Sequence, residues 1–334
     1  MIEQIEIAPG LKICRILNGM WQVSGSHGYI DPTKALEDML NYHNSGFATW
    51  DLADIYGPSE IFAGKFRKLL EKTKGKNELN NSQFLTKFVP NPGAMTKSFV
   101  GHQIDNSLEK MKTDSLDLVQ FHWWDYHNPN FIDALVHLTT LRNEGKIKHI
   151  GLTNFDTTRL EIIKEQGIKI VSNQVQYSVL DSRPEKEMIP FCKKNKISIL
   201  TYGTLLGGFL SEKYLEFPEP QKGVLNTASL QKYYNMIKVW GGWDLFQELL
   251  RVLLEISQKH ACSISNVATS FIIQKPMVAG VIIGTRLGIA EHREDNSRVF
   301  DIHLDSEDVT AIDDVNKKSN DLFERIGDCG SEYR

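Results

Sequence analysis

The sequence has few cysteines, no long apolar run and little net charge. Its four cysteines, Cys14, Cys192, Cys262 and Cys329, are scattered without the paired spacing of zinc sites and redox motifs, so we expect reduced thiols in a cytoplasmic protein. No apolar stretch approaches the ~20 residues that a membrane span needs. The first residues carry acids, so we expect no secretory signal there. A net charge of −4 favours neither nucleic acid nor a membrane surface as a partner.

Two chemical motifs are also missing. No Gly-x-Gly-x-x-Gly follows an expected strand, which argues against a Rossmann nucleotide site. The ten histidines show no His-Glu-x-x-His motif and no paired spacing on a helix, so we expect no metal. Because we find no linker, low-complexity segment or repeat by identity, we expect one domain over residues 1–334.

Apolar strands and amphipathic helices alternate along most of the chain. A short hairpin is expected first, around Pro9-Gly10. Residues 15–22 are then expected to form a first strand that runs into a loop, and further strands are expected over 47–50, 83–88, 116–121, 147–152, 169–173, 197–201 and 278–283. Helices are expected over 31–44, 60–71, 96–111, 131–144, 157–165, 185–195, 243–260, 265–274 and 306–317. This order predicts an α/β fold, a (β/α)8 TIM barrel with a short N-terminal hairpin and extra helices.

Two segments do not fit the alternation. Residues 72–81 are polar and are expected to form a loop. Residues 205–240 are expected to form a long irregular insertion whose role the sequence does not indicate.

Polar or special residues lie at or just past the C-terminal ends of the expected strands. In a (β/α)8 barrel these ends meet on one face, where the active site is built. The residues are Asp51, Lys87, His122, Asn154, Gln174, Tyr202 and Gly284.

The stretch from Asp51 to Ser59 connects an expected strand to an expected helix. It presents a phenol at Tyr56, breaks at Gly57-Pro58 and offers Ser59 as an N-cap. Taken singly, Asp51, Tyr56, Lys87 and His122 have ordinary interpretations: a cap, a packed loop aromatic, a surface lysine and a structural histidine. Their occurrence together at separate strand ends favours a catalytic site.

These four side chains suit carbonyl reduction. A hydride that reaches a carbonyl carbon leaves negative charge on the oxygen, and a proton must be donated there. Tyr56 is the candidate acid, although a free phenol has a pKa near ~10. We expect the Lys87 ammonium to lower that pKa and Asp51 to keep Lys87 charged and oriented. His122 would hydrogen-bond the substrate oxygen.

The stretch resembles the active-site signature of the aldo-keto reductases, Asp-x-Ala-x-x-Tyr-Gly-x-Ser/Ala-Glu, at every fixed position. The tetrad of Asp51, Tyr56, Lys87 and His122 matches the family tetrad residue by residue, and the resemblance covers nearly the whole chain. It implies NADPH-dependent reduction of an aldehyde or ketone, or the reverse reaction as a dehydrogenase. The partner would be a small carbonyl substrate, and the sequence does not indicate an oligomeric state.

The resemblance also implies how the nicotinamide is held. Asn154 and Gln174 would hydrogen-bond its carboxamide, and Tyr202 would stack on its ring. Thr153 stands where the family usually has serine, which keeps a hydroxyl.

Gly284-Thr285-Arg286 offers a backbone turn, a hydroxyl and a guanidinium, which together suit a phosphate. The segment resembles one that faces the adenosine phosphate in part of the family, so Arg286 favours NADPH over NADH. Asn296 would contact the adenine. The family pattern continues with an Arg or Gln and then Glu-Asn. Here the corresponding segment, Glu291 to Asn296, arrives later than in that pattern, which leaves open whether His292 or Arg293 takes the outer role.

Tryptophans indicate where a substrate could bind. Trp21 resembles the family tryptophan of the first loop, and Trp123 directly follows His122. With Trp124, Trp240 and Trp243, they suggest a pocket for an aldehyde or ketone with hydrophobic or ring character. The alternative is that aromatic residues in long loops pack the loops themselves.

Two other functions are compatible with such a barrel. One is a cofactor-binding regulatory subunit with little turnover, like the potassium-channel β subunits that share this fold. The other is an aldolase-like enzyme in which Lys87 forms a Schiff base, although the Tyr56 signature disfavours it.

Overall fold

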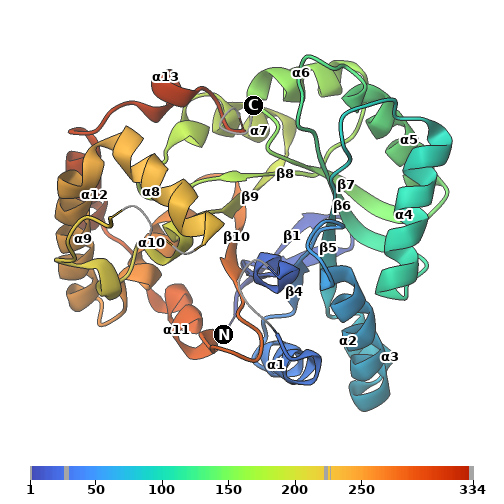
Figure 1. The fold of residues 1–334 in the computed structure, drawn as a ribbon, viewed down its shortest axis with the longest axis horizontal. Helices are drawn as coiled ribbons and strands as arrows, with labels where there is room; N and C mark the ends of the chain where they lie inside the picture. The colour runs from blue at the N-terminus through green and yellow to red at the C-terminus, as the bar shows by residue number, and fades with distance from the viewer. Residues whose placement is uncertain (1, 26–29, 222–224, 226, 331–334) are drawn as a thin grey trace.

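The computed structural model describes residues 2–25, 30–221, 225 and 227–330, and these form a closed parallel barrel (Figure 1). The strand order around the barrel is β10-β3-β4-β5-β6-β7-β8-β9, so neighbours in sequence are neighbours in space. The strands are β3 (Ile16–Gly19), β4 (Thr49–Asp51), β5 (Gln83–Phe88), β6 (Leu116–His122), β7 (Ile147–Thr153), β8 (Ser172–Gln176), β9 (Ser198–Tyr202) and β10 (Val278–Gly284). The predicted (β/α)8 fold is confirmed.

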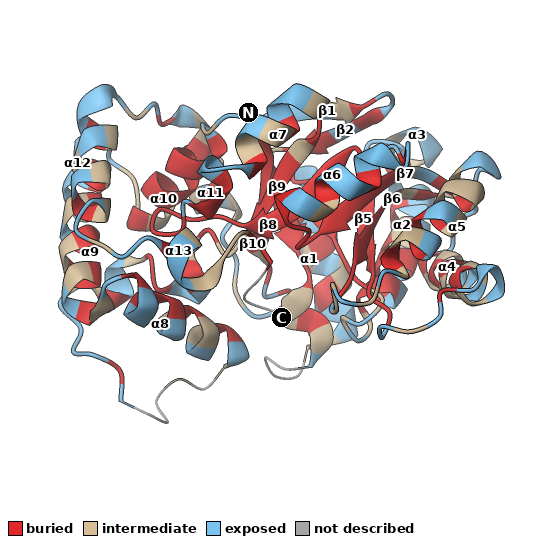
Figure 2. Cartoon of the chain, turned by 90° about the horizontal axis from the view of Figure 1, so that it is seen from above, coloured by how far each residue is buried: buried red, intermediate tan, exposed pale blue. Residues whose placement is uncertain are grey.

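Helices surround the barrel, with buried faces toward the strands and exposed faces outward (Figure 2). They are α1 (Pro32–Asn44), α2 (Ser59–Lys74), α3 (Lys76–Leu79), α4 (Lys97–Met111), α5 (Phe131–Asn143), α6 (Thr157–Glu165), α7 (Met188–Asn195), α8 (Ala228–Trp240), α9 (Gly242–Lys259), α10 (Ile264–Ile273), α11 (Arg293–Ser297), α12 (Ser306–Asn316) and α13 (Leu322–Ile326). Short 3-10 turns are η1 (Trp21–Ser24), η2 (Arg183–Glu185), η3 (Leu206–Gly208), η4 (Glu212–Tyr214) and η5 (Arg298–Asp301).

Side-chain caps explain where several helices begin. The Asp31 carboxylate accepts hydrogen bonds from the N–H groups of Thr33 and Lys34, at 2.8 and 3.2 Å, and Pro32 occupies the first position of α1. Ser263 and Asn266 form a reciprocal capping box at the start of α10. These boundaries follow from local chemistry, and both lie within one residue of the predicted helix starts.

The N-terminal hairpin lies against one end of the barrel. Its strands, β1 (Gln4–Ala8) and β2 (Leu11–Cys14), pair antiparallel as predicted. Leu11 and Ile13 of β2 pack in one apolar cluster with Leu17, Leu85 and Leu118 from the barrel strands. Because this cluster fills the end where the strands begin, the opposite end is the one available for chemistry.

Two segments that we expected to be irregular are helical. Residues 72–81 contain the end of α2 and the short α3. The second half of the insertion forms α8, which the Thr227 hydroxyl caps by accepting from Leu230 N–H at 3.2 Å. Its buried residues Tyr233, Met236, Ile237 and Trp240 recur at helical spacing. This spacing was the signal for a helix, and α8 packs beside α9 (Figure 1).

Two expectations about the class of protein can be compared with the structure. Among the described residues, no helix combines the length and apolar character that a membrane crossing requires. All four cysteines lie in the described part of the chain, and none of them forms a disulfide bond there. Burial raises the pKa of the Cys192 thiol to about 12, so this thiol stays protonated and unreactive near neutral pH.

Candidate active site

The ends of β4 and β5 hold a buried ion pair. Lys87 Nζ lies 2.5 Å from Asp51 Oδ2 and also donates to the Leu52 carbonyl at 3.1 Å. The same ammonium lies 4.9 Å from the centroid of the Tyr56 ring. Three members of the predicted tetrad therefore converge on one point at the C-terminal face of the barrel.

Backbone contacts fix the loop that carries Tyr56. Leu52 N–H donates to the Leu85 carbonyl at 2.8 Å, and Asp54 N–H donates to the Lys87 carbonyl at 3.1 Å, so the loop continues along β5. Gly57 has φ +51° and faces the Ser24 backbone, which favours glycine there. Ser59 does not cap α2 as we expected. It is the first helical residue, and its hydroxyl donates to the Ala53 carbonyl at 3.0 Å.

The electrostatics of Tyr56 differ from our expectation. Burial, followed by the charges of Asp51 and Asp54, raises the pKa of Tyr56 above its ordinary value. Burial lowers the pKa of Lys87, while Asp51 opposes that change. Because the Lys87 charge is balanced by Asp51 at 2.5 Å, the ammonium does not lower the phenol pKa. Among the described residues, none hydrogen-bonds the Tyr56 hydroxyl, so it is available to a substrate oxygen.

Asp54 is an ionisable residue of the site that we did not predict. Its Oδ2 accepts from Val89 N–H at 3.1 Å, while its buried Oδ1 has no hydrogen-bond partner among the described residues. Burial raises the pKa of Asp54 to about 6. A carboxyl two residues from the phenol, at a variable position of the signature, was the signal that could have identified it.

His122 ends β6 and is buried. The Trp124 ring lies 4.2 Å from the His122 ring, measured between centroids, and is 36% exposed. Trp123 is fully buried against Phe121, and its indole N–H donates to the carbonyls of Asp125 and Asn128. Trp123 therefore has no exposed surface for a substrate, which corrects our prediction. Successive side chains point to opposite sides along an extended chain, so Trp124, two residues after His122, lies beside it and Trp123 does not.

Gln174 lies deeper than we predicted. We expected the sixth strand to end before it, but β8 runs from Ser172 to Gln176 and places Gln174 at its centre. The Gln174 amide nitrogen donates to Asp51 Oδ1 at 2.8 Å and to Gln120 Oε1 at 2.7 Å. Its amide nitrogen is thus engaged inside the barrel, directly beneath the ion pair.

Asn154 and Tyr202 form a second pair on the same face. The Tyr202 hydroxyl donates to Asn154 Oδ1 at 2.8 Å. Asn154 has φ +58°, a conformation that asparagine tolerates better than most residues, and Tyr126 OH donates to its carbonyl. Tyr202 is half-buried, and the Lys232 ammonium lies 4.9 Å from the centroid of its ring.

Gly284, Thr285 and Arg286 continue from the end of β10. A Cβ at Gly284 would lie 2.1 Å from the Gln22 amide nitrogen, so the Gln22 side chain in this conformation packs directly against the glycine backbone. Thr285 Oγ1 donates to the Gly19 carbonyl at 2.9 Å, which ties β10 to β3 and uses the hydroxyl proton. Arg286 is exposed and has no ion pair among the described residues.

The remaining predicted residues lie in different surroundings. Trp21 begins η1 directly after β3 and is half-buried. Asn296 is buried in α11. Trp240 and Trp243 are buried as well, and Trp243 Nε1 donates to the Phe217 carbonyl at 2.9 Å. These two tryptophans therefore pack the insertion itself, which was the alternative to a substrate pocket.

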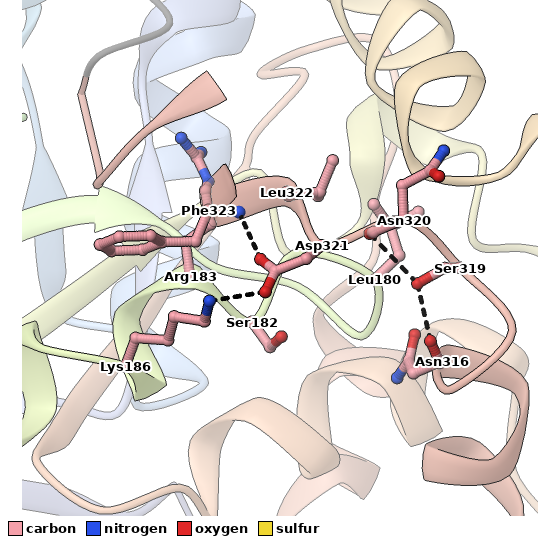
Figure 3. Close-up of a pocket in the computed structure, with 10 residues that line it drawn as sticks. All are labelled: Leu180, Ser182, Arg183, Lys186, Asn316, Ser319, Asn320, Asp321, Leu322 and Phe323. Carbon is pink, nitrogen blue, oxygen red and sulfur yellow. Dashed lines mark hydrogen bonds and ion pairs between the residues drawn. The ribbon is translucent and has the colours of Figure 1, made fainter. Parts of the chain in front are cut away.

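A cavity of about 220 Å³ lies between the loop after β8 and the C-terminal segment (Figure 3). Lys186 and Asp321 pair across it at 2.5 Å, and Asp321 also caps α13 by accepting from Phe323 N–H at 2.8 Å. None of the predicted site residues is among those that line it. We assign no chemistry to this cavity, because Lys186 is engaged with Asp321 and Arg183 with Asp181.

Comparisons with known proteins indicate one family. The model of the Aldo/keto reductase family matches residues 15–317. Aldo-keto reductase YhdN of Bacillus subtilis is 29% identical over 217 residues, which cover 62% of this chain and 63% of that protein. The NADH-specific methylglyoxal reductase of Escherichia coli is 24% identical over 328 residues, which cover 90% and 94%.

Solved structures show the same architecture. The crystal structure of an aldo/keto reductase from Klebsiella pneumoniae, in complex with NADP and acetate, superposes with a TM-score of 0.70. It is 18% identical and covers 95% of this chain and 96% of that chain, so the likeness establishes the fold alone.

Proposed function

Because this chain belongs to the aldo/keto reductase family, a family of nicotinamide-dependent oxidoreductases that act on carbonyl and alcohol groups, we propose that it reduces an aldehyde or ketone with NADPH. The observation that carries the proposal is the buried Lys87–Asp51 pair beneath the ring of Tyr56. The two relatives named above carry reductase names, which favours turnover over a purely regulatory subunit.

Tyr56 would donate the proton. Its raised pKa keeps the phenol protonated across neutral pH, which suits an acid in the direction of reduction. Its hydroxyl would bind the carbonyl oxygen in the ground state and give up its proton as charge develops there. In the reverse direction the phenolate would be needed, so alcohol oxidation should require alkaline pH.

The other three tetrad residues would hold this geometry. Asp51 keeps Lys87 in place under the phenol, and the pair adds a fixed dipole to a buried site. His122 would donate a hydrogen bond to the same substrate oxygen from β6. An aldolase-like Schiff base at Lys87 is disfavoured, because its nitrogen is already bound to a carboxylate and a carbonyl.

The residues present fit a nicotinamide dinucleotide, which when bound supplies the hydride. Gln22 Oε1 is buried beside Gly284 without a hydrogen-bond partner among the described residues, so it can accept from a ligand. Asn154 and the carbonyl oxygen of Gln174 would hold the carboxamide, and Tyr202 would cover the ring. The Gly284–Arg286 turn would receive a phosphate, and Asn296 the adenine.

The preference for NADPH rests on Arg286. A guanidinium without an ion pair among the described residues, at the end of β10, suits the additional phosphate of NADPH. The relatives differ in this respect, because the Escherichia coli protein is named NADH-specific and the Klebsiella protein was solved with NADP.

The substrate is proposed to carry an apolar group or ring. Trp124 covers His122 and is partly exposed, and Ile55, which precedes the proposed acid, is 54% exposed. Trp21, at the start of η1, would form a further wall. Apolar side chains next to His122 and Tyr56 suit a hydrophobic aldehyde better than a highly hydroxylated one.

Fluorescence titration with NADPH and NADH, followed by turnover of a panel of aldehydes, tests the proposal. We expect tighter binding of NADPH and faster reduction of apolar or aromatic aldehydes. Tight binding without any turnover would instead support the regulatory role. Binding of neither dinucleotide would overturn the proposed function.

A further inference from the structure

Gln120 lies at the centre of the barrel, two residues before His122 on β6, and is fully buried. Its amide nitrogen donates to Asp51 Oδ1 at 2.9 Å, and its amide oxygen accepts from Gln174 Nε2 at 2.7 Å. Gln174 Nε2 also donates to Asp51 Oδ1 at 2.8 Å. Three residues from three strands thus form a closed triangle of hydrogen bonds below the Lys87–Asp51 pair.

The charge of Asp51 determines how both amides are oriented. A carboxylate only accepts hydrogen bonds, so each glutamine must turn its NH2 group toward it. The Gln120 oxygen then faces Gln174, and the Gln174 oxygen is left as that residue's remaining acceptor. Because every member is nearly fully buried, no water competes for these bonds and neither amide can reverse without losing them.

We propose that Gln120 is a positioning residue that couples the catalytic carboxylate to the amide expected to hold the nicotinamide. Its amide nitrogen donates to Asp51 Oδ1 together with that of Gln174, which leaves Oδ2 for Lys87. Its amide oxygen binds the NH2 group of Gln174 and so keeps the carbonyl oxygen of Gln174 turned toward the cofactor. This inference rests on the proposed function, since it assigns Gln174 to the carboxamide.

The chain contains a matched control for a variant at this position. Gln176 is also fully buried, and its amide nitrogen donates to a carboxylate, Asp181 Oδ2, at 2.7 Å. Gln120→Met and Gln176→Met therefore remove the same chemical group from equally buried sites. Both should lower stability, but only Gln120→Met should alter the nicotinamide half of the site.

Binding of NADPH is compared with binding of 2′-phospho-ADP-ribose, which lacks nicotinamide. Loss of a hydrogen bond to a charged group changes an equilibrium constant by roughly ten- to a hundredfold. We therefore expect Gln120→Met to weaken the binding of NADPH by about tenfold and to lower kcat by at least as much. Affinity for the fragment should be unchanged, and Gln176→Met should alter neither affinity nor kcat.

A second variant gives a readout that a merely structural role would not produce. In Gln120→Glu, a protonated carboxyl can donate to Asp51 and accept from Gln174, as the amide does, whereas the ionised form repels Asp51. The kcat of Gln120→Glu relative to wild type should therefore rise as the pH is lowered from 8 to 5.5. The corresponding ratio for Gln120→Met should not depend on pH.

The outcomes separate the two proposals. If wild type neither binds NADPH nor reduces an aldehyde, the proposed function fails. If wild type is active, and Gln120→Met matches Gln176→Met in NADPH affinity and kcat, the positioning role is overturned. Should Gln120→Met not fold by circular dichroism, the pH dependence of Gln120→Glu decides, and a flat ratio overturns the role.

Discussion

Lys87 Nζ and Asp51 Oδ2 lie 2.5 Å apart at the adjoining ends of β5 and β4, and both side chains are nearly fully buried. A buried charge that loses its partner is costly, whereas loss of both charges is much less so. The pair therefore contributes to the stability of the fold as well as to the candidate active site.

Removing either partner should destabilise the protein. We expect Lys87→Met and Asp51→Asn each to lower the free energy of unfolding by about 3–5 kcal/mol, because each leaves an uncompensated charge or donor. The double variant should lose clearly less than the sum. Urea denaturation of all four proteins measures this coupling, and strictly additive losses would show that the two residues do not act as a pair.

Tyr56→Phe should nearly abolish carbonyl reduction while dinucleotide binding is kept. The variant retains the ring over Lys87 and loses only the hydroxyl, so kcat should fall by about 10²- to 10⁴-fold. Steady-state kinetics and a fluorescence titration with NADPH measure the two effects separately. A variant that lost NADPH binding instead would move Tyr56 out of the role of acid.

Arg286→Ala should weaken NADPH much more than NADH. Loss of a charge-assisted bond to the extra phosphate should raise the dissociation constant for NADPH by about tenfold or more. Lys68→Ala, at an exposed position of α2, is the control for a general change in surface charge. Equal weakening of both dinucleotides would show that Arg286 does not distinguish them.

Asp54→Asn should change the pH dependence of stability. The pKa of Asp54 is raised from 3.8 to about 6 in the folded protein, so the folded state binds more protons than the unfolded state between these values. The stability that the protonated carboxyl contributes is present below about pH 4 and is lost as the pH rises through about 6.

The asparagine variant can keep the bond from Val89 N–H without a buried charge. It should therefore exceed wild type in free energy of unfolding by about 1–2 kcal/mol at pH 8, and the difference should shrink toward pH 4. Denaturation series at several pH values test this. A constant difference across the range would mean that Asp54 titrates normally.

Local patterns in the chain were enough to predict the barrel, the hairpin and the residues of the tetrad. Asp31-Pro32 marks the start of α1 because a carboxylate cap and a proline act within one turn. Asp51 ends β4 and Tyr56 lies in the loop that follows, whereas Lys87 and His122 lie at the ends of the next two strands. Period and spacing therefore placed all four residues at or just past the ends of strands without knowledge of tertiary contacts.

What depends on pairing between strands could not be predicted in the same way. The position of β8 relative to β7 and β9 places Gln174 inside the barrel, and a shift by one residue would turn its side chain to the other face. The same alternation separates the buried Trp123 from Trp124 beside His122. Gln120, with no motif of its own, meets Asp51 and Gln174 only because closure of the barrel brings three strands to one axis. The pKa of Tyr56 was decided there too, since the burial that chiefly raises it exists only in the folded chain.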